Sequence, residues 1–274
     1  MIGAIIGDII GSRFEFDNHL SEEFELFAKR SVFTDDSALT IAVARWLLGD
    51  GPLVTILVDE FDGYPGLSYG GGFNRWASYG GGDPYDSFGN GAAMRVSAVG
   101  HFARDETDCL DLARDSAAVT HSHPEGIKGA QATAWSVWAA LNGATASHIR
   151  QEIQARFKYD MVKDWFTGYE FDVTCPGTVP PALICALEAT SYERAVRKMV
   201  SIGGDTDTIC AIGGALAEVL FGIPPEIEAE ANKRLDEHVL GVIELFRNRL
   251  HLVQPSPHSL VIRRRTKEPP ETWW

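Results

Sequence analysis

The chain has 274 residues, of which 45% are hydrophobic and 23% are charged. These values are typical of a globular protein near the upper size for one hydrophobic core. Acidic residues exceed basic ones, giving a formal net charge of −14; this charge would repel a polyphosphate backbone and argues against nucleic-acid binding.

The cysteines, at positions 109, 175, 185 and 210, form no closely spaced pair, so we expect reduced thiols and a cytoplasmic protein. No apolar run reaches the ~20 residues of a membrane span. The apolar start of the chain has no basic leader and is interrupted by Asp8. We therefore expect neither a membrane anchor nor a signal peptide.

Helical spacing of apolar residues dominates the chain, and sustained strand alternation is absent. Stop and start residues support two boundaries, with Gly49 ending the first helix and Ser191 capping another. The sequence therefore predicts an all-α fold, a compact orthogonal many-helix domain over residues 1–250. The predicted helices are 36–50, 109–123, 129–144, 182–190, 191–204 and a long amphipathic helix at 226–250.

Two segments differ from this pattern. Residues 63–91 are rich in Gly and Tyr and lack a helical period, so we predict a ligand-facing loop. Residues 251–274 are Pro-rich with a basic run at 263–265, and we predict a loosely attached tail rather than a docking motif.

Acidic and hydroxyl residues stand directly before two apolar helices. "GGDTDT" contains Asp205, Asp207 and Thr208, and "FTDDS" contains Thr34 and the pair 35–36. Helix capping explains one acidic residue in front of a helix. It does not explain two in each cluster, so a shared metal site is favoured over two sets of caps.

Magnesium is the cation that these residues suggest, because it prefers carboxylate, hydroxyl and water oxygens. Zinc is disfavoured because its Cys/His spacing is absent, whereas Mn²⁺ fits the same oxygen ligands. Two Mg²⁺ ions would need several carboxylates from separate segments. The candidate metal ligands are Thr34, Asp35, Asp36, Asp205, Asp207 and Thr208.

Three further elements are candidates for ligand contact. Glu15, in "GDIIGSRFE", is either an exposed acid or a mobile carboxylate near the metals, and spacing does not choose between these. "SFGNG", residues 87–91, provides glycines that let backbone N–H groups approach an anion, although a plain loop-to-helix corner is the more frequent explanation of such a turn. His121 and His123 are either helix-end contacts or, for one of them, part of a ligand pocket.

These blocks, in the order "GDIIGSRFE", "FTDDSALT", "SFGNGAAMR", "THSHPEG" and "GGDTDTICAIGGALAE", resemble the ADP-ribosylglycohydrolase family, also called ADP-ribosyl-acceptor hydrolases. The resemblance implies an all-α fold with a binuclear magnesium site formed by the six ligands named above. It also implies a flexible catalytic or metal-gating glutamate at Glu15. Ser87, Gly89, Asn90 and Gly91 would lie near phosphate, Phe88 near the base and His121 against the ligand.

The predicted reaction is hydrolysis of the ribose C1″ bond in an ADP-ribosylated protein or a small ADP-ribose conjugate, with an arginine linkage favoured. Glu15, Asp35 or Asp36 would transfer the proton. A non-catalytic ADP-ribose binder on the same fold and a different magnesium-dependent nucleotide hydrolase are the alternatives. We expect a monomer.

Overall fold

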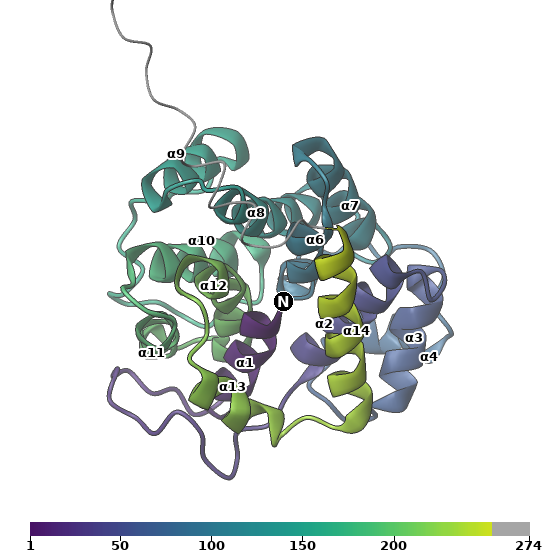
Figure 1. Cartoon of the computed structure of the whole chain (residues 1–274), viewed down its shortest axis with the longest axis horizontal. Helices are drawn as coiled ribbons and strands as arrows, with labels where there is room; N and C mark the ends of the chain where they lie inside the picture. The colour runs from purple at the N-terminus through teal and green to yellow at the C-terminus, as the bar shows by residue number, and fades with distance from the viewer. Residues whose placement is uncertain (254–274) are drawn as a thin grey trace, which may run out of the picture.

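The structure, a computed structural model, describes residues 1–253 and the side chains of residues 1–250. Within this range the regular elements are helices, and one isolated bridge joins Gly89 to Thr174, so the all-α class is confirmed. Figure 1 shows α1 and α12 at the centre with the other helices around them. The elements are α1 Ile2–Gly11, η1 Ser12–Phe14, α2 Asp35–Leu48, α3 Leu53–Gly63, α4 Gly71–Ser78, α5 Gly91–Met94, α6 Ser97–Phe102, α7 Glu106–Ala118, α8 Pro124–Leu141, α9 Ala146–Phe157, α10 Cys175–Glu188, α11 Tyr192–Ile202, α12 Thr206–Phe221, α13 Pro225–Asn232 and α14 Glu237–Val253.

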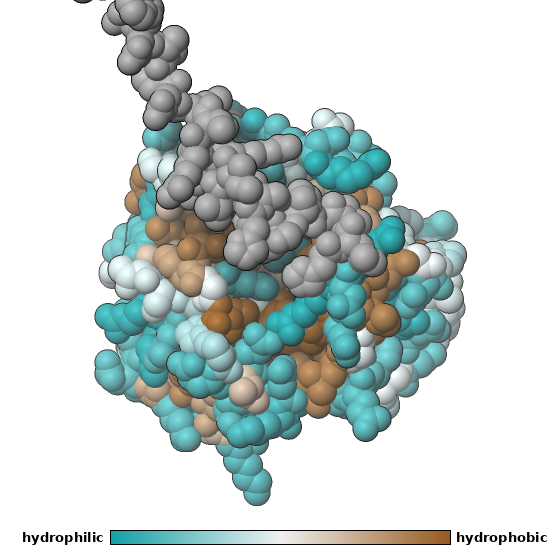
Figure 2. Space-filling model, viewed as in Figure 1, coloured by the Kyte–Doolittle hydropathy of each residue, from teal (hydrophilic) through white to brown (hydrophobic). Residues whose placement is uncertain are grey.

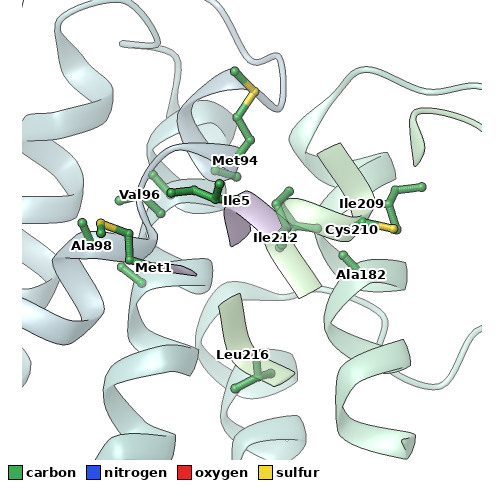
Figure 3. Packing of buried hydrophobic residues seen from close by; sticks show 14 of the residues in the cluster. Met1, Ile5, Met94, Val96, Ala98, Ala182, Ile209, Cys210, Ile212 and Leu216 are labelled. Atoms are coloured by element: carbon green, nitrogen blue, oxygen red, sulfur yellow. The ribbon is translucent and has the colours of Figure 1, made fainter. Parts of the chain in front are cut away.

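The centre of the core is the packing of α1 on α12, with α10 and α11 against the other sides of α12. Both central helices are buried along most of their lengths. Figure 3 shows Ile5 of α1 beside Ile212 of α12, and both side chains are almost fully buried. A helix that is apolar on all sides is typical of such a central position.

Glycine lets the backbones of α1 and α12 touch. Gly3, Gly7 and Gly11 are spaced four apart and share one face of α1. A Cβ at Gly7 would overlap the Cys210 carbonyl, and a Cβ at Gly214 would overlap the Gly3 carbonyl. The two helices therefore approach more closely than helices with larger side chains at the contact can, and the N-terminus of α12 is fixed against the end of α1.

Two predicted helix boundaries are confirmed. Gly49 ends α2 in the left-handed conformation with φ 96°, and its N–H bonds the carbonyl of Arg45 or Trp46. Ser191 caps α11, because its Oγ accepts a hydrogen bond from the Arg194 N–H at 3.2 Å.

The predicted single helix at 226–250 is wrong, because the chain forms α13 and α14 with a break between them. Asp236 Oδ1 accepts from the Val239 N–H at 2.9 Å and so caps a new helix. A capping Asp lies where an amphipathic pattern also allows a polar residue, so periodicity did not reveal the break.

The loop predicted at 63–91 is partly wrong, because it contains α4, which buries Phe73 and Trp76. One apolar pair is too short a pattern to indicate a helix among glycines. The helix predicted at 182–190 begins earlier, at Cys175, since Pro180 and Pro181 lie inside α10 and hid its first turns.

The tail predicted from residue 251 lies outside the described residues from 254 onward, whereas 251–253 continue α14. Within the described chain, no helix combines the length and apolar character that crossing a bilayer requires. On the face drawn in Figure 2, hydrophobic residues form small areas among hydrophilic ones.

The glycine contact gives a stability prediction. We expect Gly7→Ala to lower the free energy of unfolding by about 1–3 kcal/mol, because the added methyl overlaps the backbone of α12. Gly241→Ala is the matched control, since it lies within α14 with nothing within 4 Å of a Cβ, and should stabilise by up to about 1 kcal/mol. Urea denaturation of both variants measures the difference; equal effects would show that the close approach is unimportant.

Candidate active site

A cleft of about 420 Å³ lies over the N-termini of α2 and α12. One side carries carboxylates and the other carries glycine-rich backbone, so the cleft has two chemically different ends. The carboxylate side contains Glu15, Asp35, Asp36, Asp205, Asp207 and Thr208. The other side contains Ser68, Gly70–Phe73, Tyr85, Ser87, Gly89–Gly91, Arg95 and His121.

Asp8, from the middle of α1, positions the start of α2. Its Oδ2 accepts from the Thr34 N–H at 2.9 Å and from the Ser37 N–H at 3.1 Å. Both hydroxyls, Thr34 Oγ1 at 2.8 Å and Ser37 Oγ, also donate to this carboxylate. Thr34 in turn caps α2 by accepting from the Asp36 N–H. Asp8 therefore satisfies N–H groups that a helix leaves unpaired, and it fixes Asp35 and Asp36 at the cleft.

The start of α12 is organised differently, because Asp205 at its N-cap position makes no side-chain capping bond. Its Oδ2 instead accepts from the Asn90 amide at 2.6 Å. The alternative that Asp205 serves only as a helix cap is therefore contradicted. Asn90, which the family resemblance placed near phosphate, has its side chain bonded to Asp205 and to Thr178 at 3.1 Å.

The two acidic segments meet in the cleft. The Thr208 hydroxyl donates to Asp36 Oδ2 at 3.4 Å, which joins α12 to α2. Oxygens of Glu15, Asp205 and Asp207 all lie within 4.8 Å of one another. Asp36 Oδ1 is buried and has no hydrogen-bond partner among the described residues. An orphaned buried carboxylate oxygen among other carboxylates is what a bound cation would satisfy.

Burial disfavours the charged form of each carboxylate, and the neighbouring carboxylates add to this effect. Burial raises the pKa of Asp8 to about 6, and burial with neighbouring acidic charge raises those of Glu15 and Asp35 to about 7. Burial and the adjacent aspartates raise the pKa values of Asp36 and Asp207 well above the usual value of an aspartate.

None of the ion pairs formed within the described residues involves these carboxylates, so no basic side chain neutralises them directly. All the donor atoms are hard oxygens from carboxylates and hydroxyls. The group therefore fits a divalent cation such as Mg²⁺ or Mn²⁺.

The glycine-rich side brings backbone, His121 and a half-exposed aromatic residue together at the cleft. Ser87 Oγ accepts from the Gly89 N–H at 3.1 Å and shapes this turn. His121 lies against Gly91 and is only 4% exposed. Phe88 is 47% exposed and packs on His123 with ring centroids 5.2 Å apart, beside the cleft rather than in its wall.

Residues 70–72, at the start of α4, are a part of the cleft that the sequence did not identify individually. Their glycines do occur within the loop predicted to face the ligand, so composition alone could have indicated them.

Arg95 is a second residue that sequence reasoning missed, although it follows "SFGNGAAM" directly. It is fully buried, and its Nε and Nη1 have no partner among the described residues. Its Nη2 donates to the Ser116 carbonyl at 2.8 Å and to Thr120 Oγ1 at 2.9 Å. Burial lowers the pKa of Arg95 to about 10, so the guanidinium stays charged at neutral pH.

Thr120 links Arg95 to His121, because its Oγ1 lies 2.7 Å from His121 Nδ1. Arginine can only donate, so the threonine hydrogen is available for Nδ1. We therefore assign His121 a proton on Nε2, the nitrogen nearest Gly91. Burial and the Arg95 charge lower the His121 pKa well below its usual value, which keeps the ring neutral.

The sequence profile of ADP-ribosylglycohydrolase matches residues 1–257. The chain belongs to the ADP-ribosylglycohydrolase family. The resemblance drawn from the sequence blocks is thereby confirmed, and the family is one of glycosidase-type hydrolases.

Two curated relatives illustrate the range of the ADP-ribosylglycohydrolase family. ADP-ribosylhydrolase ARH3 of Xenopus tropicalis is 24% identical over 300 residues, covering 81% of this chain and 86% of that protein. ADP-ribosyl-[dinitrogen reductase] glycohydrolase of Rhodospirillum rubrum is 25% identical over 260 residues, covering 81% and 84%.

Among solved structures, an ADP-ribosylglycohydrolase-related protein complex aligns with a TM-score of 0.67 and 22% identity. The alignment covers 90% of this chain and 95% of that one, and supports the shared fold.

The hydrogen-bond chain to His121 gives a prediction. Thr120→Val removes the hydroxyl that donates to Nδ1, so we expect the ring to lose its preference for Nε2–H and ADP-ribose to bind about tenfold more weakly. Thr120→Ser keeps the hydroxyl and should bind as wild type does. The ¹⁵N shifts of the His121 ring report the tautomer, and calorimetry reports affinity. An Nδ1–H ring in the wild-type protein would contradict the assignment.

Proposed function

We propose that this protein is a magnesium-dependent hydrolase that releases ADP-ribose from a modified protein side chain, with arginine as the favoured linkage. The observation that carries the proposal is the meeting of the two acidic helix N-termini at one end of a cleft whose other end is glycine-rich backbone. The names of the relatives, ADP-ribosylhydrolase and ADP-ribosyl-[dinitrogen reductase] glycohydrolase, support the same substrate class.

The cleft suits an ADP-ribose group in size and in polarity. Its volume of about 420 Å³ lies within the range of small-molecule sites. The diphosphate would lie against the backbone of residues 70–72 and 87–91, with the His121 Nε2–H as a neutral donor. The terminal ribose would then reach the carboxylates at the other end.

Two Mg²⁺ ions, with Mn²⁺ as an alternative, would be held by the six ligands predicted from the sequence, Thr34, Asp35, Asp36, Asp205, Asp207 and Thr208. When bound, they would neutralise the carboxylates and favour binding of the anionic substrate and its ribose hydroxyls.

Cleavage of the C1″ bond develops positive charge on the ribose ring, which nearby carboxylates stabilise. Glu15 is the strongest candidate for proton transfer, because it is partly exposed at the cleft and its pKa is raised to about 7. Asp35 has a similarly raised pKa and is the second candidate. Asp36 is more deeply buried, and we assign it to metal binding only.

The deciding experiment follows free ADP-ribose by mass spectrometry, using an arginine-ADP-ribosylated protein in Mg²⁺ with and without EDTA. We expect Asp36→Asn and Asp207→Asn to lower kcat/KM by about 10²–10³. Asp111→Asn, an exposed position on α7, is the control and should keep full activity. Folded Asp36 and Asp207 variants with wild-type activity would overturn the proposal.

The products separate the alternatives. Tight binding of ADP-ribose without turnover on arginine, serine or O-acetyl linkages would indicate a non-catalytic binder. Release of AMP or inorganic phosphate would indicate a different nucleotide hydrolase.

Removal of the metal should lower the stability of the fold more at high pH than at low pH. The folded pKa values of Asp8, Glu15 and Asp35, about 6 and 7, lie above the unfolded values of about 4. Between these values the folded state binds more protons, so in EDTA these groups make the fold less stable as the pH rises. A cation needs deprotonated ligands, so it should counter this loss most strongly at high pH.

We therefore expect excess Mg²⁺ to raise Tm by a few degrees more at pH 8 than at pH 5, measured by scanning fluorimetry against EDTA. The Asp36→Asn/Asp207→Asn double variant should lose this difference. An equal Mg²⁺ effect at both pH values would contradict the prediction.

Cytoplasmic location and a monomeric state stay predictions. The four cysteines are free and buried.

A further inference from the structure

The tripeptide Glu-Phe-Asp occurs twice in the chain, at 15–17 and at 170–172, and the fold brings the two copies together. Phe16 and Phe171 stack with ring centroids 6.3 Å apart and an interplanar angle of 20°. One copy follows η1, and the other lies in the segment between α9 and α10.

The aromatic pair faces solvent rather than the core. Phe16 is 80% exposed and Phe171 is 49% exposed. By contrast, the adjacent Phe14 is buried and packs against Phe24 at 5.0 Å. Burial in the core therefore does not account for the position of Phe16, whose ring meets that of Phe171 at the surface.

Both copies are held beside the carboxylate end of the cleft. Asn18, next to the first copy, donates to the Gly204 carbonyl at 3.1 Å and accepts from the Gly204 N–H at 2.8 Å. Tyr169, next to the second copy, lies against Gly204 from the other segment. Val173, just after the second copy, accepts from the Asn90 N–H at 2.8 Å, and the Asn90 side chain connects this contact to the carboxylate end by donating to Asp205. The pair is thus anchored around the residue that precedes Asp205.

This location is on the acceptor side of the proposed reaction. Glu15 lies in the cleft with Asp205 and Asp207, where the ribose C1″ would react. The nucleotide would occupy the opposite, glycine-rich end. Phe16 directly follows Glu15 in the chain, so the aromatic pair adjoins the end of the cleft where the group attached to C1″ would lie.

The charges around the pair are acidic. Each phenylalanine has a carboxylate on both sides in sequence, from Glu15, Asp17, Glu170 and Asp172. Among the ion pairs of the described residues, Asp17 alone of these four has a partner, Arg30 at 3.3 Å, and both of those side chains are largely exposed. Exposed aromatic faces within negative charge favour a cation, above all a planar guanidinium.

We propose that Phe16 and Phe171 form the docking site for the polypeptide that carries the ADP-ribose, and that they bind an arginine side chain of that polypeptide by stacking. Glu170, which is in none of the ion pairs of the described residues, supplies the complementary charge. This inference rests on the proposed function and deepens it, because it assigns the enzyme a basic polypeptide as its substrate rather than a small ADP-ribose conjugate.

The test compares two substrates with the same linkage: an arginine-rich peptide with one ADP-ribosyl-arginine, and free ADP-ribosyl-arginine. We expect Phe16→Ser/Phe171→Ser to lower kcat/KM on the peptide about tenfold, mainly through KM, and to change the free conjugate less than about twofold. Glu170→Gln should lower peptide kcat/KM at low salt only. Phe221→Ser, an exposed aromatic at the far end of α12, is the control.

Equal loss on both substrates would show that the pair only shapes the site, and no loss on the peptide would show that it does not bind the acceptor; either result overturns the proposal. If the wild type cleaves neither substrate, the proposed function fails by itself. In that case, fluorescence anisotropy measures binding of the unmodified arginine-rich peptide, which tests the Phe16–Phe171 surface without catalysis. Weaker binding by the double variant supports the docking site, and unchanged binding overturns it.

Discussion

The backbone contact between α1 and α12 is the constraint on which the site depends. Gly3, Gly7 and Gly11 remove the side chains that would separate the two helices. The same helix α1 carries Asp8 on another face, where it accepts the N–H groups at the start of α2. One helix thus fixes both acidic helix N-termini, and a shift of α1 would move them relative to each other.

The site concentrates like charge in a place that water reaches poorly. Folding stability alone would disfavour such an arrangement, because burial and mutual repulsion raise the pKa values of the carboxylates. Strongly perturbed groups of this kind cluster at functional sites. A bound divalent cation explains how the protein could keep them ionised, and it also explains how a chain with net charge −14 could hold an anionic nucleotide.

The opposite end of the cleft would hold the anionic nucleotide with backbone and with the buried guanidinium of Arg95. Arg95 has no carboxylate partner among the described residues, and it contacts the cleft both directly and through Thr120 and His121. A neutral His121 donor adds no charge that would attract the nearby carboxylates. Under the proposed function, the two ends would recognise different parts of one elongated ligand, and the Phe16–Phe171 pair would extend this recognition beyond the cleft.

The sequence by itself determined the all-α class, the family and the residues of the two acidic clusters, because these follow from local periodicity and from short blocks with fixed spacing. It did not determine what joins them. In the sequence, Asp8 is only an interruption of an apolar run, and Arg95 is only the end of a motif. Nothing in the sequence indicated a role for Phe171. Their roles depend on partners 21 to 155 residues away, such as Ser116, Thr34 and Phe16. Only the packing of α1, α2 and α12 brings such partners together, since backbone contact and burial arise from the whole fold and not from neighbouring residues.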